Sequence, residues 1–239
     1  LLAEQLAAVG QLAAGMAHEL RNPLTSMKLL VQGAQAGASG EGGGADAWAA
    51  PGLSSRDLSV LEEEITRLEQ LVQSFLDFAQ PPKPEKRALD VLPLIEQTLA
   101  FVAGRAAAAS TRIEFTSTAR PAITSVDPGQ FRQVLLNLVL NALDAMAGGG
   151  AITVTLEREG ESWLTLRVLD QGSGLPAALG ERIFDPFTTT KETGLGLGLS
   201  ICRRIAAAHG GTLTGANRAG GGAVFTLRLP AAQVAVLCS

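Results

Sequence analysis

Cysteine is scarce in this sequence of 239 residues. Its two cysteines, Cys202 and Cys238, lie far apart and form no CxxC pair, which argues against a disulfide scaffold and against a zinc site. Such sparse use of cysteine is typical of a reducing compartment, so we predict a cytoplasmic location.

A long hydrophobic run and a basic excess are also missing. Asn137, Asn141 and Asp144 interrupt the most apolar stretch, which leaves no run of the roughly 18 apolar residues that a membrane span needs. We therefore expect no membrane contact from this segment. The net charge of −4 gives no electrostatic basis for binding nucleic acid. No secretory signal occurs, and because Leu1 lies inside a helical pattern we interpret the chain as a segment of a longer protein.

Periodicity in the N-terminal third predicts a first helix and a loop. Apolar residues at spacings of three and four predict a helix over residues 1–32, in which Pro23 removes one hydrogen bond and favours a kink. Residues 33–52 are rich in glycine and lack periodicity, which predicts a connecting loop. This loop could contain a helix end near Gln35.

A second helix follows the loop. Ser54 and Asp57 resemble a capping box at its start, and Pro81 stops it. A heptad seam runs between them, formed by Leu58, Leu61, Ile65, Leu68, Val72, Phe75 and Ala79. One hairpin of two such helices covers only part of its apolar surface. We therefore predict that two hairpins pair as a homodimer with a four-helix bundle.

The pattern changes after the second helix. We predict a helical domain over residues 1–80, a linker over 81–87, a mixed domain over 88–230 and a tail over 231–239. Candidate strands of the mixed domain are 112–118, 123–126, 151–158, 162–170, 212–217 and 223–229. Candidate helices are 91–106, 128–147 and 195–208. Short turns between neighbouring strands favour an antiparallel or mixed sheet, so the chain as a whole is α+β, with an α/β sandwich after the helical hairpin.

The familiar nucleotide motifs are absent. No Gly-Lys pair occurs, which excludes a P-loop, and GLGLG lacks the GxGxxG spacing of a dinucleotide fold. The protein-kinase signature set is missing too.

Three other features of the mixed domain point to a nucleotide. Asp170 follows a predicted strand and can accept a hydrogen bond from the exocyclic amine of adenine, while Gly172 and Gly174 permit positive φ and close backbone approach. Asn137 and Asn141 share one helix face, and an amide oxygen is a suitable ligand for Mg²⁺. Finally, a glycine run leads into a helix whose free N–H groups can bind phosphate. Each feature alone also fits a plain turn or a polar helix face, but their order along the chain is specific.

Four segments resemble the N, G1, F and G2 boxes of histidine-kinase ATP domains: NLVLNALDA, DQGSG, FDPF and GLGLGLS. The segment AHELRNPL resembles the H box of a histidine-kinase dimerisation and phosphotransfer domain. Together these resemblances cover about residues 5–230. The ATP domain is similar to those of gyrase, MutL and the heat-shock chaperone ATPases, and FDPFTTTK is similar to the nitrogen-regulatory branch of sensor kinases.

The resemblance implies roles for the residues of the ATP domain. Asn141 would coordinate Mg²⁺, Asn137 would support the phosphates of ATP, and Asp170 would bind the adenine amine. The phosphates would also contact the glycine run, which consists of Gly194, Leu195, Gly196, Leu197 and Gly198.

An ATP lid is implied over residues 171–193, with Phe184 and Phe187 as its anchoring aromatics. Lys191 is a candidate for a phosphate contact, since a cation on the lid would arrive as the lid closes.

The implied phosphoryl acceptor is His18. Leu6 and Val9 set positions a and d of the first helix, which puts His18 at position f on the outer face, where an attacking imidazole needs to be. By resemblance, Glu19 would act as the general base. Asn22, one turn further on, matches the position that in related kinases orients water for dephosphorylation of the partner, so a second, phosphatase activity is implied.

Asn137 distinguishes transfer from hydrolysis within this superfamily. Related ATPases carry a glutamate four residues before the metal asparagine, and asparagine there is no base. The implied function is ATP-dependent autophosphorylation of His18, followed by transfer to an aspartate of a response regulator receiver domain. The segment would then lie in the cytoplasm, either as a cytoplasmic protein or as the cytoplasmic part of a membrane-bound sensor. A serine kinase of the anti-sigma type and a non-catalytic ATP-sensing dimer are the alternatives.

The sequence departs from the family pattern at two positions. Asp144 stands where many relatives carry Lys or Arg, and Ala223 where many carry Thr or Ser. His209 precedes a glycine pair and is predicted to end a helix in a structural role. Cys202 is predicted to be a core residue.

Overall fold

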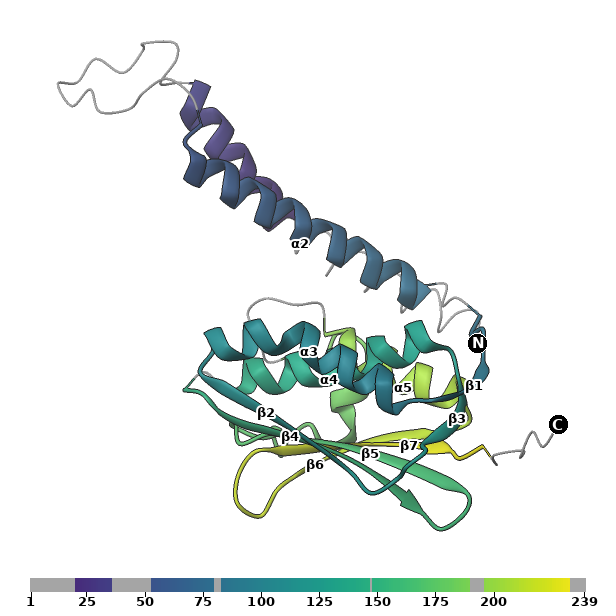
Figure 1. The fold of residues 1–239 in the computed structure, drawn as a ribbon. Coiled ribbons are helices and arrows are strands. Elements are labelled where there is room, and N and C mark those ends of the chain that lie inside the picture. Colours follow the sequence, from purple (N-terminus) through teal and green to yellow (C-terminus); the bar gives the residue numbers. More distant parts are fainter. Residues whose placement is uncertain (1–19, 36–52, 80–82, 147, 190–195, 233–239) are drawn as a thin grey trace. The chain divides into compact units, whose positions relative to one another are not determined.

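The computed structural model describes residues 20–35, 53–79, 83–146, 148–189 and 196–232 (Figure 1). Contacts within the chain divide it into two units, which are described separately: Leu1–Pro81 with Thr189–Leu197, and Pro82–Thr188 with Gly198–Ser239. No helix in the described ranges is both long and apolar enough to cross a bilayer.

The first unit contains two described helices, residues 20–35 and α2 (Ser55–Ala79). The first of them reaches Gln35, beyond the predicted end at residue 32, and its predicted part over residues 1–19 lies outside the described residues. The predicted capping box at the start of α2 is confirmed. The hydroxyl Oγ of Ser54 accepts from the backbone N–H of Asp57 at 3.1 Å, and Asp57 Oδ2 accepts from the backbone N–H of Ser54 at 2.9 Å. Hydrogen bonds from the side chain and backbone of Ser54 hold the pKa of Asp57 below its usual value.

An apolar stripe along α2 is exposed in the single chain. Leu58, Ile65 and Val72 recur every seven residues and are 55%, 49% and 42% exposed. Helix 20–35 likewise exposes Leu24 and Leu29. Within the described residues, the chain therefore leaves its heptad seam partly uncovered.

The second unit contains two sheets. In the small one, β1 (Arg87–Asp90) pairs antiparallel with β3 (Ile123–Val126). The large one has the order β2-β4-β5-β7-β6, formed by β2 (Thr111–Ser117), β4 (Gly150–Glu159), β5 (Trp163–Leu169), β7 (Ala223–Pro230) and β6 (Thr212–Asn217). Strands β2 and β4 are parallel and the other neighbours are antiparallel, so the predicted mixed sheet is confirmed.

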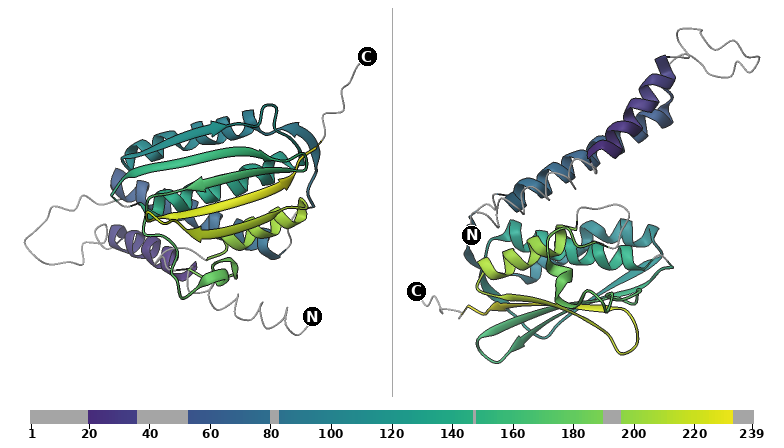
Figure 2. Two further views of the ribbon diagram at one scale, coloured as in Figure 1. Left: turned by 90° about the horizontal axis from the view of Figure 1, so that it is seen from below. Right: turned by 180° about the vertical axis from the view of Figure 1, so that it is seen from behind.

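Three helices cover one face of the large sheet: α3 (Leu92–Ala108), α4 (Pro128–Ala145) and α5 (Gly198–Ala208) (Figures 1 and 2). Alternation along the strands explains this arrangement, because Leu164, Leu166 and Val168 of β5 are all buried in the core. The α/β sandwich predicted from the sequence is confirmed.

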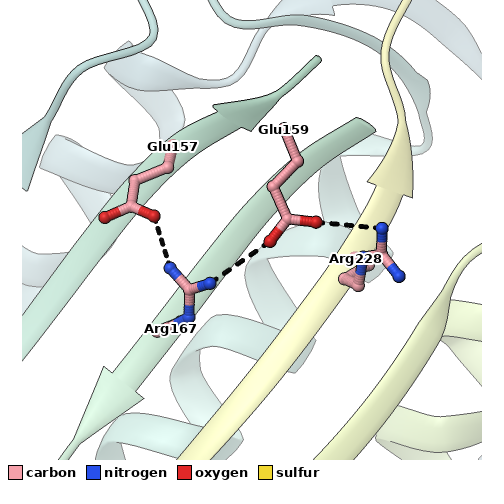
Figure 3. A network of polar contacts seen from close by, with 4 residues as sticks. All are labelled: Glu157, Glu159, Arg167 and Arg228. Carbon is pink, nitrogen blue, oxygen red and sulfur yellow. Dashed lines mark hydrogen bonds and ion pairs between the residues drawn. The ribbon is translucent and has the colours of Figure 1, made fainter. Parts of the chain in front are cut away.

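Charged residues occupy the opposite face of the sheet. Arg167 lies between Glu157 and Glu159, and Glu159 Oε2 also accepts from Arg228 at 2.9 Å (Figure 3). The guanidinium of Arg228 lies 5.0 Å from the ring centre of Trp163. These partly exposed ion pairs link β4, β5 and β7, and each contributes little on its own.

Three elements differ from the predictions. Strand β1 and the 3-10 helix η1 (Gly180–Phe184) were not predicted. The helix predicted over residues 195–208 begins only at Gly198, because Gly196 has a φ of 63° and this left-handed conformation cannot continue a helix.

Candidate functional site

Asp170 follows β5 and is fixed by the backbone around it. It is only 2% exposed, and its Oδ1 accepts from the backbone N–H groups of Gly172 at 2.8 Å and Ala223 at 3.0 Å. Among the described residues, none donates a hydrogen bond to the other oxygen, Oδ2. A buried carboxylate with one oxygen held by the protein suits a ligand that brings its own N–H donor.

The glycines after Asp170 permit close packing. A Cβ at Gly172 would overlap the backbone carbonyl of Ala145 at the end of α4, and a Cβ at Gly174 would lie 2.6 Å from Asn217 Oδ1. Gly174 has a φ of 77°. Of the two properties that these glycines were predicted to permit, positive φ is found at Gly174 and close backbone approach at Gly172.

Sequence reasoning missed a group of residues that follow Asp170 by about 50 positions in the sequence and support it or its loop in the fold. Arg218 Nη1 donates to the backbone oxygen of Asp170. The amide of Asn217 accepts from the N–H of Leu175 at 2.6 Å and donates to its carbonyl at 2.9 Å. Gly222 has a φ of 82°, and a Cβ there would overlap the backbone of Asp170. The glycine run over 220–222 was the available signal, but a sequence does not say which backbone approaches it.

Gly222→Ala is expected to lower the free energy of unfolding by about 2 kcal/mol, since the new methyl group meets backbone and the residue must keep a left-handed φ. Urea unfolding followed by circular dichroism measures the change. Gly220→Ala is the matched control, because a Cβ there meets nothing within 4 Å. Equal stability of the two variants would contradict this account of Gly222.

Helix α4 carries the two asparagines. Asn137 Nδ2 donates to Cys202 Sγ at 3.6 Å, and a Cβ at Gly198 would lie 3.9 Å from Asn137 Cγ. Asn141 lies one turn further on the same face and is half-buried. The predicted core position of Cys202 is confirmed, and burial raises the pKa of this thiol to about 12.

One face of α4 brings the predicted motifs together. Asn137 lies beside Gly198, and Ala145 lies beside Gly172, so Asn141 falls between Gly198 and the loop after Asp170. Gly198 begins α5, and the first turn of a helix favours an anion through its N–H groups and its dipole. The arrangement offers a carboxylate at one end, an amide oxygen in the middle and a helix N-terminus at the other end.

The other predicted site residues belong to the first unit or lie outside the described residues. Gly196 has a left-handed φ, and Leu197 is 2% exposed. Asn22 is exposed on helix 20–35. The remaining ones lie outside the described residues: His18, Glu19, Lys191, Gly194 and Leu195.

The described part of the predicted lid is attached through Phe184. This ring is 3% exposed and meets Phe225 edge to face, with ring centres 6.5 Å apart. The guanidinium of Arg203 on α5 lies 5.2 Å from the centre of the Phe184 ring. Phe187 is half-buried and has a φ of 64°. The burial of Phe184 agrees with its predicted anchoring role.

Asp144 and Ala223, which depart from the family pattern, each make a contact within the second unit. Asp144 pairs with Arg105 of α3 at 3.4 Å. Ala223 serves Asp170 through its backbone N–H, which any residue except proline would provide. His209 ends α5 and is 5% exposed; Gly210 follows it with a φ of 73°, as expected of a glycine helix cap.

Comparison with known proteins gives two family matches. Residues 8–83 match the model of the His Kinase A (phospho-acceptor) domain. Residues 126–233 match the model of the histidine kinase-, DNA gyrase B- and HSP90-like ATPases. The chain belongs to the histidine kinases. This family member carries both the acceptor domain and the ATPase domain.

Similar proteins include sensor histidine kinases of enteric bacteria. The chain is 37% identical over 229 residues to the sensor histidine kinase ZraS of Klebsiella oxytoca, covering 95% of this chain and 47% of that protein. It is 34% identical over 230 residues to the histidine-protein kinase AtoS of Escherichia coli (strain K12), covering 95% of this chain and 36% of that protein. The chain therefore spans about half the length, or less, of these curated relatives.

Solved structures give the same family. The catalytic domain of the histidine kinase ThkA is 33% identical with a TM-score of 0.57, covering 62% of this chain and 96% of that one. ThkA in complex with the response regulator protein TrrA has a TM-score of 0.76 at 28% identity, covering 96% of this chain and 64% of that one.

Proposed function

We propose that this chain transfers the γ-phosphoryl group of ATP to His18 and then passes it to an aspartate of a response regulator. The observation that carries the proposal is that one chain matches both the phospho-acceptor domain, over residues 8–83, and the ATPase domain, over residues 126–233. The first match includes His18, and the second includes Asn137, Asn141 and Asp170.

The residues of the site described above fit ATP. Asp170 Oδ2 would accept from the adenine amine, because Oδ1 already accepts two backbone N–H groups. The N-terminus of α5 at Gly198 would bind phosphate oxygens. Asn137 would lie beside those phosphates, with its Nδ2 turned toward Cys202.

Mg²⁺ also fits the residues of this site. The described residues contain no group of three or more His, Cys, Asp or Glu side chains that could hold a metal ion. A hard ion held by one amide oxygen of Asn141 together with phosphate and water oxygens is the arrangement that Mg²⁺ favours. When bound, Mg²⁺ supplies charge neutralisation on the phosphoryl oxygens.

The chemistry at His18 is a direct displacement. A neutral imidazole nitrogen forms a bond to the γ-phosphorus, and the bond from that phosphorus to the bridging oxygen of ADP breaks. Glu19 would take the proton that the imidazole loses. Hydrolysis is disfavoured because Asn137 stands where related ATPases have a glutamate, and an amide cannot activate water.

The proposed partners are a second copy of the chain and a response regulator. The exposed heptad residues Leu58, Ile65 and Val72 would pack against the second copy in a four-helix bundle. The similar kinase ThkA has been solved in complex with the response regulator TrrA, which supports a receiver domain as acceptor here. Asn22, which is exposed, would serve a phosphatase activity toward the same regulator.

Incubation with γ-labelled ATP and Mg²⁺ tests the proposed function. The chain is expected to acquire a label that is lost in acid and retained in base, as a phosphorylated histidine is. An acid-stable label would instead indicate the serine kinase. Nucleotide binding without any label would indicate the ATP-sensing dimer.

A further inference from the structure

Asp127 joins three separate parts of the second unit. It is the N-cap of α4, where its Oδ1 accepts from the backbone N–H groups of Gly129 at 2.8 Å and Gln130 at 3.0 Å. Its Oδ2 accepts from the backbone N–H of Glu85 at 2.9 Å. Glu85 precedes β1 and lies within the predicted linker 81–87, 42 residues before Asp127 in the sequence.

The backbone of Asp127 is held as firmly as its side chain. Its N–H donates to Nε2 of His209 at 3.0 Å, and Nδ1 of His209 lies 2.8 Å from the carbonyl oxygen of Ile205 on α5. This pair of bonds requires the tautomer in which Nδ1 carries the proton. The end of α5, the start of α4 and the linker therefore meet at one residue.

The carboxylate of Asp127 is ionised at neutral pH. Partial burial raises its pKa, but the backbone N–H groups of Gln130, Glu85 and Gly129 outweigh this effect, so the pKa lies below its usual value. Both oxygens are consequently available as acceptors.

We propose that Asp127 is a positioning residue for phosphoryl transfer, because it attaches the linker at Glu85 to the helix that carries Asn137 and Asn141. This inference rests on the proposed function. It assigns to the N-cap of α4 a role in setting where the chain leaves the ATP-binding unit on its way to the phospho-acceptor domain.

The expected size of the effect follows from the number of residues between the end of α2 and the first residue that the second unit holds. Helix α2 ends at Ala79, and with the Asp127 bond intact the chain is next fixed at Glu85, a reach of at most about 21 Å. Without the bond the next fixed residue is Arg87 in β1, which extends the reach to about 28 Å. The effective concentration of a tethered group falls with linker length as roughly the −3/2 power or more steeply. A loss of at least about 1.5-fold in the transfer rate follows.

Asp127→Asn tests the proposal in the full chain. Two N–H groups converge on Oδ1 and one on Oδ2, so the amide oxygen is expected to stay with α4 while the amide nitrogen faces Glu85 and cannot accept its N–H. In amide hydrogen exchange, Glu85 should lose its protection while Gly129 and Gln130 keep theirs. ATP affinity should stay within about twofold of wild type, and the phosphorylation rate of His18 at saturating ATP should fall by at least about 1.5-fold.

Two further variants sharpen the result. Glu85→Pro removes the donor from the other side of the same bond, so the double variant should lose no more than either single variant. Asp90→Asn is the matched control: Asp90 Oδ1 accepts from the N–H groups of Leu92 and Ala122 and bonds to none of the described linker residues, so the rate should be unchanged.

Each outcome separates the two proposals. An unchanged rate in Asp127→Asn, or a loss that comes from weaker ATP binding, overturns the positioning role alone. Protection of the Glu85 amide that survives the substitution overturns it as well. Absence of label on the wild-type chain overturns the proposed function, and the positioning role with it.

Discussion

His18→Gln is expected to abolish the acid-labile label while leaving ATP binding unchanged. Glutamine has a side chain of similar reach but no nucleophilic nitrogen, so the γ-phosphorus has no acceptor. The two proposed activities lie on different parts of the chain, with His18 inside the phospho-acceptor match over 8–83 and the nucleotide residues inside the ATPase match over 126–233. Phosphorylation is measured with γ-labelled ATP, and affinity by titration with a fluorescent ATP analogue.

The control for His18→Gln is the ATP affinity of the same protein. Unchanged affinity shows that the ATP-binding unit is folded and that only the acceptor was lost. Label that persists on the variant at the wild-type level would rule out His18 as the acceptor, whatever the affinity.

Asp170→Asn is expected to weaken ATP binding by at least about 1,000-fold with little loss of stability. The amide oxygen can still accept from Gly172 and Ala223, so the loop and the start of β7 keep their hydrogen bonds. The amide nitrogen then replaces Oδ2 and turns a donor toward the adenine amine, which is itself a donor. Sites built to pair with one polar group reject a mismatched one by factors of this order.

Titration with ATP and urea unfolding measure the two sides of this prediction. Asp90→Asn makes the same chemical change at another carboxylate that caps backbone N–H groups, and should leave ATP affinity unchanged. Wild-type affinity in Asp170→Asn would show that adenine binds elsewhere. A large loss of stability would show instead that Asp170 acts mainly as a structural residue.

The sandwich and the order of its motifs could be predicted because both depend on local patterns. Alternation gave the core strands, and the spacing of Asn137 and Asn141 places them on one helix face wherever that helix lies. Strand β1 was missed because Arg87–Asp90 is short, polar at its start and fully specified only by its partner β3. The linker was predicted as a plain polar connection because the Glu85–Asp127 bond spans 42 residues and leaves no local trace.

The glycines of the site also could not be explained from the sequence alone. A sequence shows that Gly172, Gly174 and Gly222 lack a side chain but not which neighbour requires it. At Gly174 and Gly222 the backbone is left-handed, whereas at Gly172 only the carbonyl of Ala145 excludes a methyl group. Because these neighbours come from distant parts of the chain, the reason for each glycine becomes visible only in the fold.

Helix α4 also sets the distance between the two ends of the site. The contacts of Asn137 with Gly198 and of Ala145 with Gly172 are eight residues apart, about 12 Å along the axis, with Asn141 midway. One residue added or removed between them would turn one contact by about 100° around the helix and aim Asn141 away from one of its neighbours. This helix is therefore compatible with substitutions that keep its length, but not with insertions or deletions between the two contacts. The number of residues between those contacts sets the distance over which a bound nucleotide can extend.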